Sequence, residues 1–365
     1  MRHLGRLVIG LLGAVNFLFT ALLLGTAYSP YLQPTEHPVL SCLGLAFPIF
    51  LLINVGFLLF WLIIQQYKCA LLPLVGFLLC IPQIQTYCPV NFGADDPPEE
   101  GLKLISYNIM GFGDRPVGKG PENEILVYLK DSGADILCLQ EYATKRTSRH
   151  PSQRDVDKAL SAYPYRRIDT VGKDRVNSIA CYSKLPILSA HPLDYASSAN
   201  GTMVYELAWG NDTLLLINNH LESNKLTQAD KEVYEDLLND PEKEKVKSGA
   251  RLLLHKLAEA SAIRAPQADA IAREIARSPY RYIVACGDFN DLPISYTHRV
   301  IAAQMEDAFT QAGCGLGISY HRNKFYFRID HILNSPGLRA CRCKVNRQVK
   351  ASDHYPVECH IVRER

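Results

Sequence analysis

The chain has 365 residues, of which 48% are hydrophobic, and it contains 39 basic and 37 acidic residues. Four of these charges precede residue 92, at Arg2, Arg6, Glu36 and Lys68, and removing these three basic and one acidic residues leaves 36 of each sign in the remainder. This balance disfavours extensive binding to nucleic acid, because an excess of Lys and Arg on the phosphates supplies most of its sequence-independent affinity.

Apolar runs dominate the first 90 residues. Leu7–Tyr28 and Val39–Ile64 contain no charged residue, and each is long enough to cross a bilayer, which takes about 20 apolar residues. A third run, Cys69–Ile84, is shorter and contains two prolines, so a core helix or a re-entrant segment is an alternative to a span. Nothing around this run offers a soluble core. We therefore expect an α-helical membrane anchor of about three transmembrane helices over residues 1–90.

Basic residues indicate how this anchor is oriented. Arg2 and Arg6 flank the first run and Lys68 lies between the second and third, whereas the loop between the first two runs has no basic residue. The positive-inside rule makes these basic ends cytoplasmic, and three crossings would place the rest of the chain outside the cytoplasm. A cleaved signal peptide would give the same side, although two further apolar runs favour a retained anchor. If the third run does not cross, the rest faces the cytoplasm instead.

A polar stretch containing prolines, residues 91–100, is expected to link the anchor to a second region, 101–365. In that region short apolar or β-branched runs alternate with amphipathic segments, which predicts a mixed α/β domain rich in strands. Helical periodicity dominates between Leu221 and Ser278, and Pro266 marks an expected boundary between two helices. We assign residues 222–263 as a helical insertion in the domain.

Polar side chains stand at the ends of several of the apolar strands. A single Asn or Asp at such a place is more often a turn former or helix cap, and a single His is more often structural. Six such strand ends in one domain predict a site instead, because the strand ends of α/β sheets gather at one rim. The residues concerned are Asn108, Glu141, His220, Asp288, Asn290, Asp330, Asp353 and His354.

Six short motifs contain these residues. They are Ser106-Tyr107-Asn108-Ile109, Leu139-Gln140-Glu141, Asn218-Asn219-His220-Leu221, Gly287-Asp288-Phe289-Asn290, Arg328-Ile329-Asp330 and Ser352-Asp353-His354. In kind and order they resemble the motifs of the endonuclease/exonuclease/phosphatase superfamily, which includes pancreatic-type deoxyribonucleases, abasic-site endonucleases, neutral sphingomyelinases and inositol polyphosphate 5-phosphatases. The resemblance implies a four-layer α/β sandwich with two mixed sheets, here preceded by the transmembrane region.

The resemblance also implies a metal site and a catalytic base. Glu141, helped by Asn108 and Asp353, would bind Mg²⁺ or Mn²⁺, since these hard ions prefer oxygen ligands. Asp288 would orient or deprotonate the attacking water. Asn290 would position that water and the phosphate.

The remaining residues of the motifs are expected to contact the substrate. His354, paired with Asp330, would hold the phosphoryl group and stabilise its developing charge. His220 would bind phosphate or protonate the leaving oxygen. Asn218 is a further candidate for a phosphate contact, and Asn177 lies in a stretch that resembles the family's third strand motif, although an ordinary polar strand residue explains it as well.

One position departs from the family pattern. Abasic-site endonucleases carry an acidic residue two positions beyond the first Asn, where this chain has Met110, and they lack a counterpart of His220.

The sequence therefore favours a divalent-metal-dependent hydrolase of phosphoester bonds beside the membrane, acting on a lipid headgroup or another phosphodiester. A membrane-tethered nuclease and a non-catalytic binding module on the same fold are the alternatives. The bilayer is the expected partner of the N-terminal helices, and no protein partner follows from the sequence.

Overall fold

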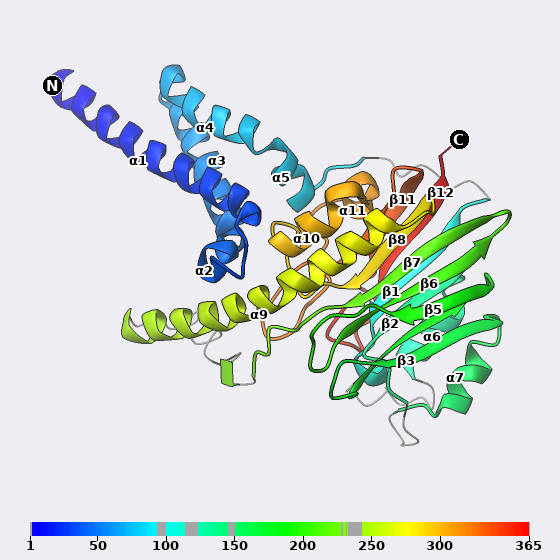
Figure 1. Ribbon diagram of the computed structural model, residues 1–365. Helices are drawn as coiled ribbons and strands as arrows, with labels where there is room; N and C mark the ends of the chain where they lie inside the picture. The colour runs from blue at the N-terminus through cyan, green and yellow to red at the C-terminus, as the bar shows by residue number, and fades with distance from the viewer. Residues whose placement is uncertain are drawn as a thin grey trace.

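The computed structural model describes residues 2–92, 100–113, 123–144, 150–227, 229, 230, 232 and 243–364. A group of N-terminal helices, here called the helical segment (residues 2–87), lies at one end of an α/β sandwich (Figure 1). Residues 93–99 of the expected linker, and most of 228–242 in the expected insertion, lie outside the described residues.

The helical segment is built around three packed helices. α1, α3 and α4 contact one another, and the shorter α2 and α5 stand at the end nearer the sandwich (Figure 1). Buried polar side chains join the first two: Thr20 Oγ1 donates to Asn54 Oδ1 at 2.8 Å, and Trp61 Nε1 donates to Asn16 Oδ1 at 2.9 Å. The bounds are α1 (Arg2–Tyr28), η1 (Ser29–Tyr31), α2 (Pro38–Ser41), η2 (Cys42–Ala46), α3 (Phe47–Ile63), α4 (Tyr67–Leu79) and α5 (Ile81–Tyr87).

Two helices in the described chain are long and apolar enough to cross a membrane, Gly5–Tyr31 and Pro38–Ile63. Large apolar side chains such as Leu52 and Ile63 point outward, 70% and 79% exposed. The third apolar run is not one straight helix, because α4 and α5 meet at 66°. Pro82 stands at the start of α5, where a missing N–H is tolerated and a new helix begins. The run is therefore either a broken span or a re-entrant loop.

Twelve strands of the described chain form two six-stranded sheets. The first has the order β11-β12-β1-β2-β4-β3 and the second β5-β6-β7-β8-β10-β9. Both are mixed, since β1 pairs with β2 and β7 with β8 in parallel, whereas the other pairs are antiparallel. The bounds are β1 (Leu102–Asn108), β2 (Ile136–Gln140), β3 (Tyr165–Val171), β4 (Asn177–Ser183), β5 (Ile187–Pro192), β6 (Gly201–Trp209), β7 (Asp212–His220), β8 (Tyr282–Asp288), β9 (Glu306–Asp307), β10 (Asp330–Asn334), β11 (Leu338–Val345) and β12 (Val357–Arg363).

Three apolar cores hold the layers together. One lies between the sheets and contains residues of both, such as Leu104 and Leu216. The second packs α6 (Glu124–Asp131) and α7 (Gln153–Ala159) onto the first sheet, and the third packs α9 (Lys243–Arg277) and α10 (Tyr296–Ile301) onto the second. α11 (Ala308–Ala312) lies beside β11. The four-layer α/β sandwich expected from the sequence is confirmed.

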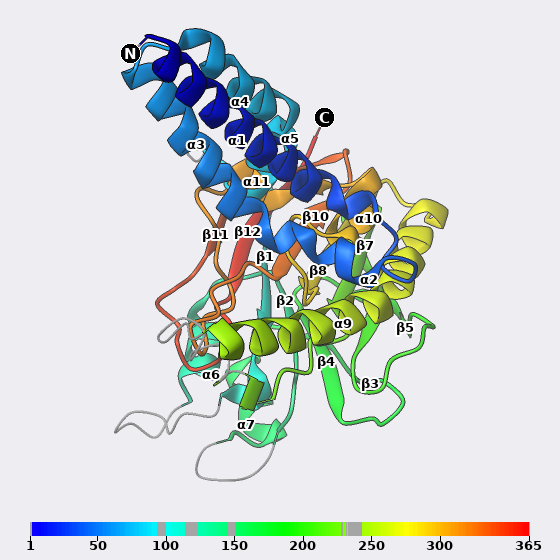
Figure 2. The ribbon, with the colours of Figure 1, turned by 90° about the vertical axis from the view of Figure 1, so that its left-hand side faces the viewer.

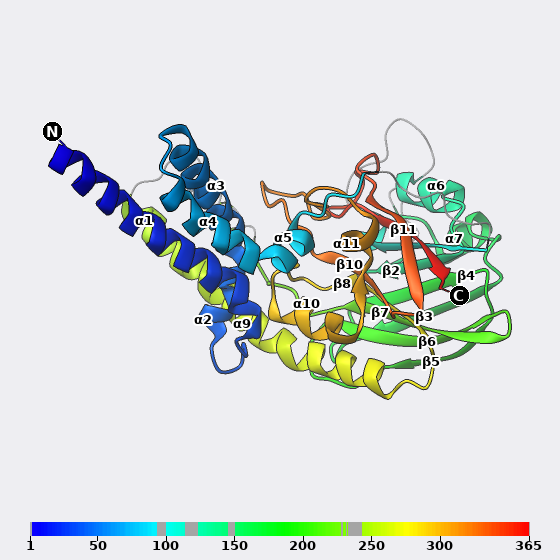
Figure 3. The same cartoon turned by 90° about the horizontal axis from the view of Figure 1, so that it is seen from above.

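The boundary expected at Pro266 is wrong, because α9 continues through this residue. A proline inside a helix removes one hydrogen bond and costs roughly 3 kcal/mol. Burial of Ala268, Ile271 and Ile275 against the second sheet offsets that cost. The N-terminal half of α9 projects beyond the sheets and lies beside α2 (Figures 1 and 3).

The helical segment is docked on the sandwich rather than only tethered to it (Figure 2). Ile294, in the loop after β8, belongs to the same buried cluster as Leu23 and Phe47 of the helical segment. At Gly44 in η2, a Cβ would lie 2.0 Å from the carbonyl oxygen of Ile294, so only glycine permits this approach. Arg299 Nε also donates to the carbonyl oxygen of Pro30 at 2.8 Å.

Candidate active site

Strand pairing brings three of the predicted residues into one row. His220, at the end of β7, stands opposite Asp288 at the end of β8, and Asp330, at the start of β10, stands opposite Asp288 on its other side. Asn108 ends β1 and Glu141 follows β2 in the facing sheet. Strand ends of both sheets therefore meet at one rim, as the sequence predicts.

Gly287 allows the row to form. Its φ of +133° is rarely adopted by residues with a side chain, and a Cβ would lie 2.0 Å from the carbonyl oxygen of Asn219. A larger residue would push β7 and β8 apart one position before Asp288. The glycine in this motif is thus required by backbone packing beside the site.

The imidazole of His354 is held by a carboxylate. Its Nδ1 lies 2.7 Å from Asp330 Oδ2, and its Nε2 lies 3.7 Å from Asp288 Oδ2. Burial alone would lower the pKa of His354, but the carboxylates of Asp330 and Asp288 outweigh it and raise that pKa well above its usual value. His354 is therefore an imidazolium at neutral pH.

Asp288 is buried at the centre of the site. Its Oδ1 accepts a hydrogen bond from the backbone N–H of Asn290 at 2.9 Å, and its Oδ2 accepts one from Asn108 Nδ2 at 3.0 Å. Burial raises the pKa of Asp288 to about 6, although His354 opposes the shift. The Asp288 carboxylate is mostly ionised at neutral pH and yet basic enough to accept a proton.

Glu141 and Asp353 supply oxygen atoms on the other side of the site. Asn108 Nδ2 also donates to Glu141 Oε1 at 3.1 Å, and Glu141 has a left-handed φ of +50° that is uncommon outside glycine. Burial raises the pKa of Glu141, the hydrogen bond from Asn108 opposes this, and the charge of Asp353 raises it further. A cation would relieve the repulsion between the two carboxylates, so this donor set fits a hard divalent ion.

His220 differs from His354 in its charge. Its Nε2 lies 3.6 Å from Glu141 Oε1 and 3.7 Å from Asp288 Oδ2, and its Nδ1 has no hydrogen-bond partner within the described residues. Burial lowers the pKa of His220 despite the opposing charge of Asp288. This imidazole is therefore neutral at neutral pH.

These side chains face a cavity of about 620 Å³. Asn108 and Asp330 are buried behind the lining of this cavity. Asn108 is hydrogen-bonded to Asp288, and Asp330 is hydrogen-bonded to His354. The residues predicted from the sequence that line the cavity are Glu141, His220, Asp288, Asn290, Asp353 and His354.

The structure does not bring Asn177 and Asn218 to this cavity. Asn218 lies between the sheets, where its Oδ1 accepts from Gln140 Nε2 at 2.6 Å, and Asn177 Nδ2 donates to Asn200 Oδ1 at 3.0 Å. Their amides are thus already used in structural contacts. Tyr320, which sequence reasoning missed, lines the cavity with its ring edge-on to His354 at 5.1 Å. It lies between strands, where no periodic pattern could have singled it out.

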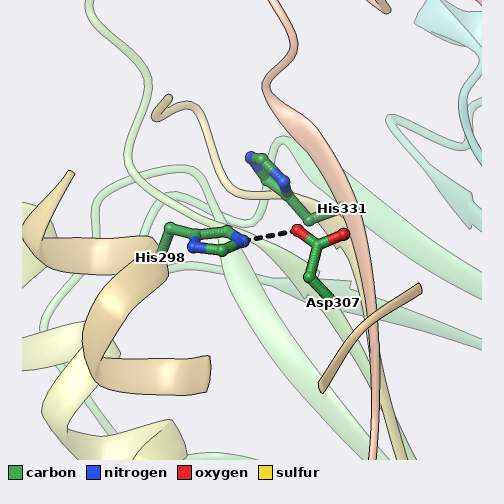
Figure 4. Close-up of side chains that lie close together, drawn as sticks. All are labelled: His298, Asp307 and His331. Carbon is green, nitrogen blue, oxygen red and sulfur yellow. Dashed lines mark hydrogen bonds and ion pairs between the residues drawn. The ribbon is translucent and has the colours of Figure 1, made fainter. Parts of the chain in front are cut away.

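A second group of acidic and histidine side chains, His298, Asp307 and His331, lies outside the lining of the cavity. Figure 4 shows how these three side chains lie together. His298 Nε2 lies 2.7 Å from Asp307 Oδ2, and the ring of His331 lies 4.7 Å from that of His298. His331 Nε2 meets the carbonyl oxygen of Asp291 at 2.9 Å. These contacts tie α10, β9 and β10 together.

Comparison with known families agrees with this geometry. Residues 105–354 match the model of the Endonuclease/Exonuclease/phosphatase family. The chain belongs to this family. Members of the endonuclease/exonuclease/phosphatase family are hydrolases, and the chain has the family's hydrolase fold. Residues 8–87 match a domain of unknown function (DUF8431). No curated protein matches the chain.

Several solved structures are similar to this chain. TDP2 from C. elegans is 17% identical, over 73% of this chain and 76% of that chain, with a TM-score of 0.47. An endonuclease/exonuclease/phosphatase from Beutenbergia cavernae is 14% identical over 72% of each chain, with a TM-score of 0.49. TDP2 from D. rerio, in complex with a single strand DNA product, is 16% identical over 72% of this chain and 99% of that one, with a TM-score of 0.48.

Proposed function

We propose that this protein is a divalent-metal-dependent hydrolase of phosphoester bonds that works beside a membrane. The observation that carries the proposal is the convergence of Asp288, the His354–Asp330 pair and Glu141 on one cavity. A base, a fixed cation and a set of oxygen ligands are the groups that phosphoester hydrolysis requires.

Asp288 acts as the general base in this proposal. With a pKa of about 6 it is ionised at neutral pH, and it takes a proton from a water that attacks phosphorus. The N–H of Asn290 and the amide of Asn108 hold the carboxylate in place. Asn290 itself lines the cavity, where its Nδ2 donates to the carbonyl oxygen of Leu221 at 3.1 Å, and the rest of its amide would orient the water and the phosphate.

The two histidines have separate tasks. His354 is cationic and held by Asp330, so it binds a phosphoryl oxygen and stabilises the negative charge that grows in the transition state. His220 is neutral. It therefore serves as a hydrogen-bond donor to the phosphate rather than as the acid that protonates the leaving oxygen.

Glu141 and Asp353, helped by Asn108, would hold Mg²⁺ or Mn²⁺. When bound, such an ion polarises the phosphoryl oxygen and offsets the charge of the substrate. Both carboxylates line the cavity, where a cation would offset their negative charge.

The substrate is proposed to be a lipid headgroup or another phosphodiester at the membrane surface. The apolar helical segment and the absence of a basic excess in residues 92–365 both support this choice over a nucleic acid. We further propose that the sandwich lies outside the cytoplasm. A reporter fused after residue 92 should then be active only in the extracytoplasmic compartment, and a cytoplasmic signal would mean that α4 and α5 do not cross.

The test is turnover by the full chain in lipid nanodiscs, assayed with bis(4-nitrophenyl) phosphate, phosphomonoesters, phospholipids and single-stranded DNA. Chelation should abolish hydrolysis, and Mg²⁺ or Mn²⁺ should restore it. A preference for DNA that falls steeply with salt would favour a nuclease instead. If no phosphoester is hydrolysed in the presence of added metal, the protein is a non-catalytic binding module instead.

A further inference from the structure

The cavity that holds the proposed active site is divided into a polar and an apolar part. The side chains of the proposed active site, such as Asp288 and His354, lie at the strand ends of the sandwich, and two further charged lining residues, Lys225 and Arg264, lie outside the sheets. Another part of the lining, here called the apolar wall, is aliphatic, and it comes from three elements outside the sheets: α9 contributes Leu253 and Leu257, η2 contributes Leu45 and α3 contributes Ile49. One continuous space of about 620 Å³ therefore joins a phosphate-binding end to a hydrocarbon surface.

The helical segment is a structural part of this wall. η2 is held against the loop after β8 by the close approach of Gly44 to Ile294, and Ile294 also lines the cavity. Ser41 Oγ lies 3.5 Å from Ser261 Oγ of α9, which closes the same side. The site is thus incomplete without residues that stand at the start of a candidate membrane span.

The apolar wall continues to the surface of the molecule. Ile49 is 58% exposed although it lines the cavity, and Leu254, another lining residue, is 36% exposed. Apolar side chains exposed beside the ends of membrane-length helices are typical of a surface that meets lipid.

We propose that the substrate is an amphiphilic phosphoester, a membrane lipid whose hydrocarbon chain lies along the wall formed by α9 and the helical segment. The phosphate would then reach Asp288 and His354 while the chain stays in apolar surroundings. This assignment rests on the proposed hydrolase function. The volume falls in the range of roughly 300–1,000 Å³ for small-molecule sites, and an aliphatic wall gives binding energy to a chain but no hydrogen bonds to a sugar or a base.

The experiment uses the full chain in detergent and a series of alkyl 4-nitrophenyl phosphate diesters, from methyl to octyl. In each, water adds its oxygen to phosphorus and the bond to 4-nitrophenol breaks, which releases 4-nitrophenol and an alkyl phosphate. All members share the scissile bond, so only the chain differs. We expect kcat/KM to rise at least tenfold from methyl to octyl, since full burial would give about fourfold per methylene.

Matched variants separate the wall from general partitioning into detergent. Ile49→Gln and Leu257→Gln alter the wall, whereas Leu52→Gln and Leu252→Gln make the same change on exposed faces of α3 and α9 outside the cavity. The octyl-to-methyl ratio of kcat/KM should fall at least fivefold in the first pair. It should stay within twofold of the parent value in the second.

The outcomes distinguish the substrate from the function. If the methyl ester is hydrolysed but chain length has no effect, or if both pairs of variants behave alike, the proposed substrate is wrong and the hydrolase proposal stands. If no ester is hydrolysed with Mg²⁺ or Mn²⁺ present, the hydrolase function is wrong and the substrate assignment falls with it.

Discussion

Two clusters of Asp and His side chains include neighbouring residues of β10: Asp330 belongs to the cluster at the cavity, and His331 belongs to the cluster with His298 and Asp307. The structure gives the two clusters different surroundings. Asp330 and His331 are neighbours in sequence, but successive side chains of a strand point to opposite faces. Asp330 therefore joins Asp288 and His354 at the cavity, whereas His331 packs against Phe289 and His298 on the helix-covered face (Figure 4).

Both clusters place possible ligand atoms within 4.8 Å of one another, so proximity alone does not separate them. Burial lowers the pKa of His331 well below its usual value. For Asp307, burial would raise the pKa, but the hydrogen bond from His298 lowers it below the usual range. The side chains of His298, Asp307 and His331 therefore bond to one another and to the backbone, whereas Asp288 and His354 of the other cluster line the cavity. Access to the cavity is the difference that matters for function.

The largest effect on turnover is expected for Asp288→Asn. An amide cannot accept the proton of the attacking water, and a positioned general base contributes about 10²–10⁴-fold. The kcat for bis(4-nitrophenyl) phosphate should fall about 1,000-fold while the thermal unfolding temperature is retained, because the amide has nearly the same shape. Full activity in the folded variant would contradict the assigned base.

Asp330→Asn should reduce kcat about 100-fold, since His354 would lose the carboxylate that orients it and keeps it charged. A purely structural role of Asp330 would leave the pH profile unchanged. We expect instead that the alkaline limb of the profile of kcat/KM moves to lower pH, because the pKa of His354 falls when a neighbouring negative charge is removed.

The pH dependence of the unmodified protein should follow the two central groups. A base works above its pKa, so kcat/KM should fall about tenfold per pH unit below the pKa of Asp288, about 6. A cationic group works below its pKa, so activity should also decline in alkali as His354, whose pKa is raised, loses its proton. A flat profile from pH 5 to 7 would argue against Asp288 as the base.

The smallest effect on turnover is expected for Asp307→Asn in the cluster outside the cavity. The side chains of His298 and Asp307 are only 5% and 7% exposed, and disrupting a buried pair of this kind costs about 3 kcal/mol in the free energy of unfolding. Denaturant unfolding should show that loss while kcat stays near the parent value. A loss of kcat without a loss of stability would mean that the two clusters are coupled.

In the helical segment, the sequence predicts the candidate spans but not the contacts that they make. Uncharged runs of sufficient length identify Leu7–Tyr28 and Val39–Ile64 as candidate spans, because the bilayer thickness sets a simple length rule. The bend between α4 and α5 and the contact of Gly44 with Ile294 depend on packing between distant segments. No local pattern encodes such contacts, so the contribution of Leu45 and Ile49 to the cavity was not foreseen.

The sequence by itself determined the mixed α/β character of the domain and most of the polar residues at the rim, and the family resemblance implied the two-sheet architecture. It could do so because hydrophobic periodicity marks strands and helices, and because the family's motifs place polar residues at strand ends. It also pointed to Asn177 and Asn218, whose amides the structure uses elsewhere. Only the tertiary structure decided which Asp and His side chains share a cavity, which charge each histidine carries, and that another part of the cavity lining is apolar. These properties depend on burial and on distances between residues far apart in the chain, and burial and distance exist only once the chain has folded.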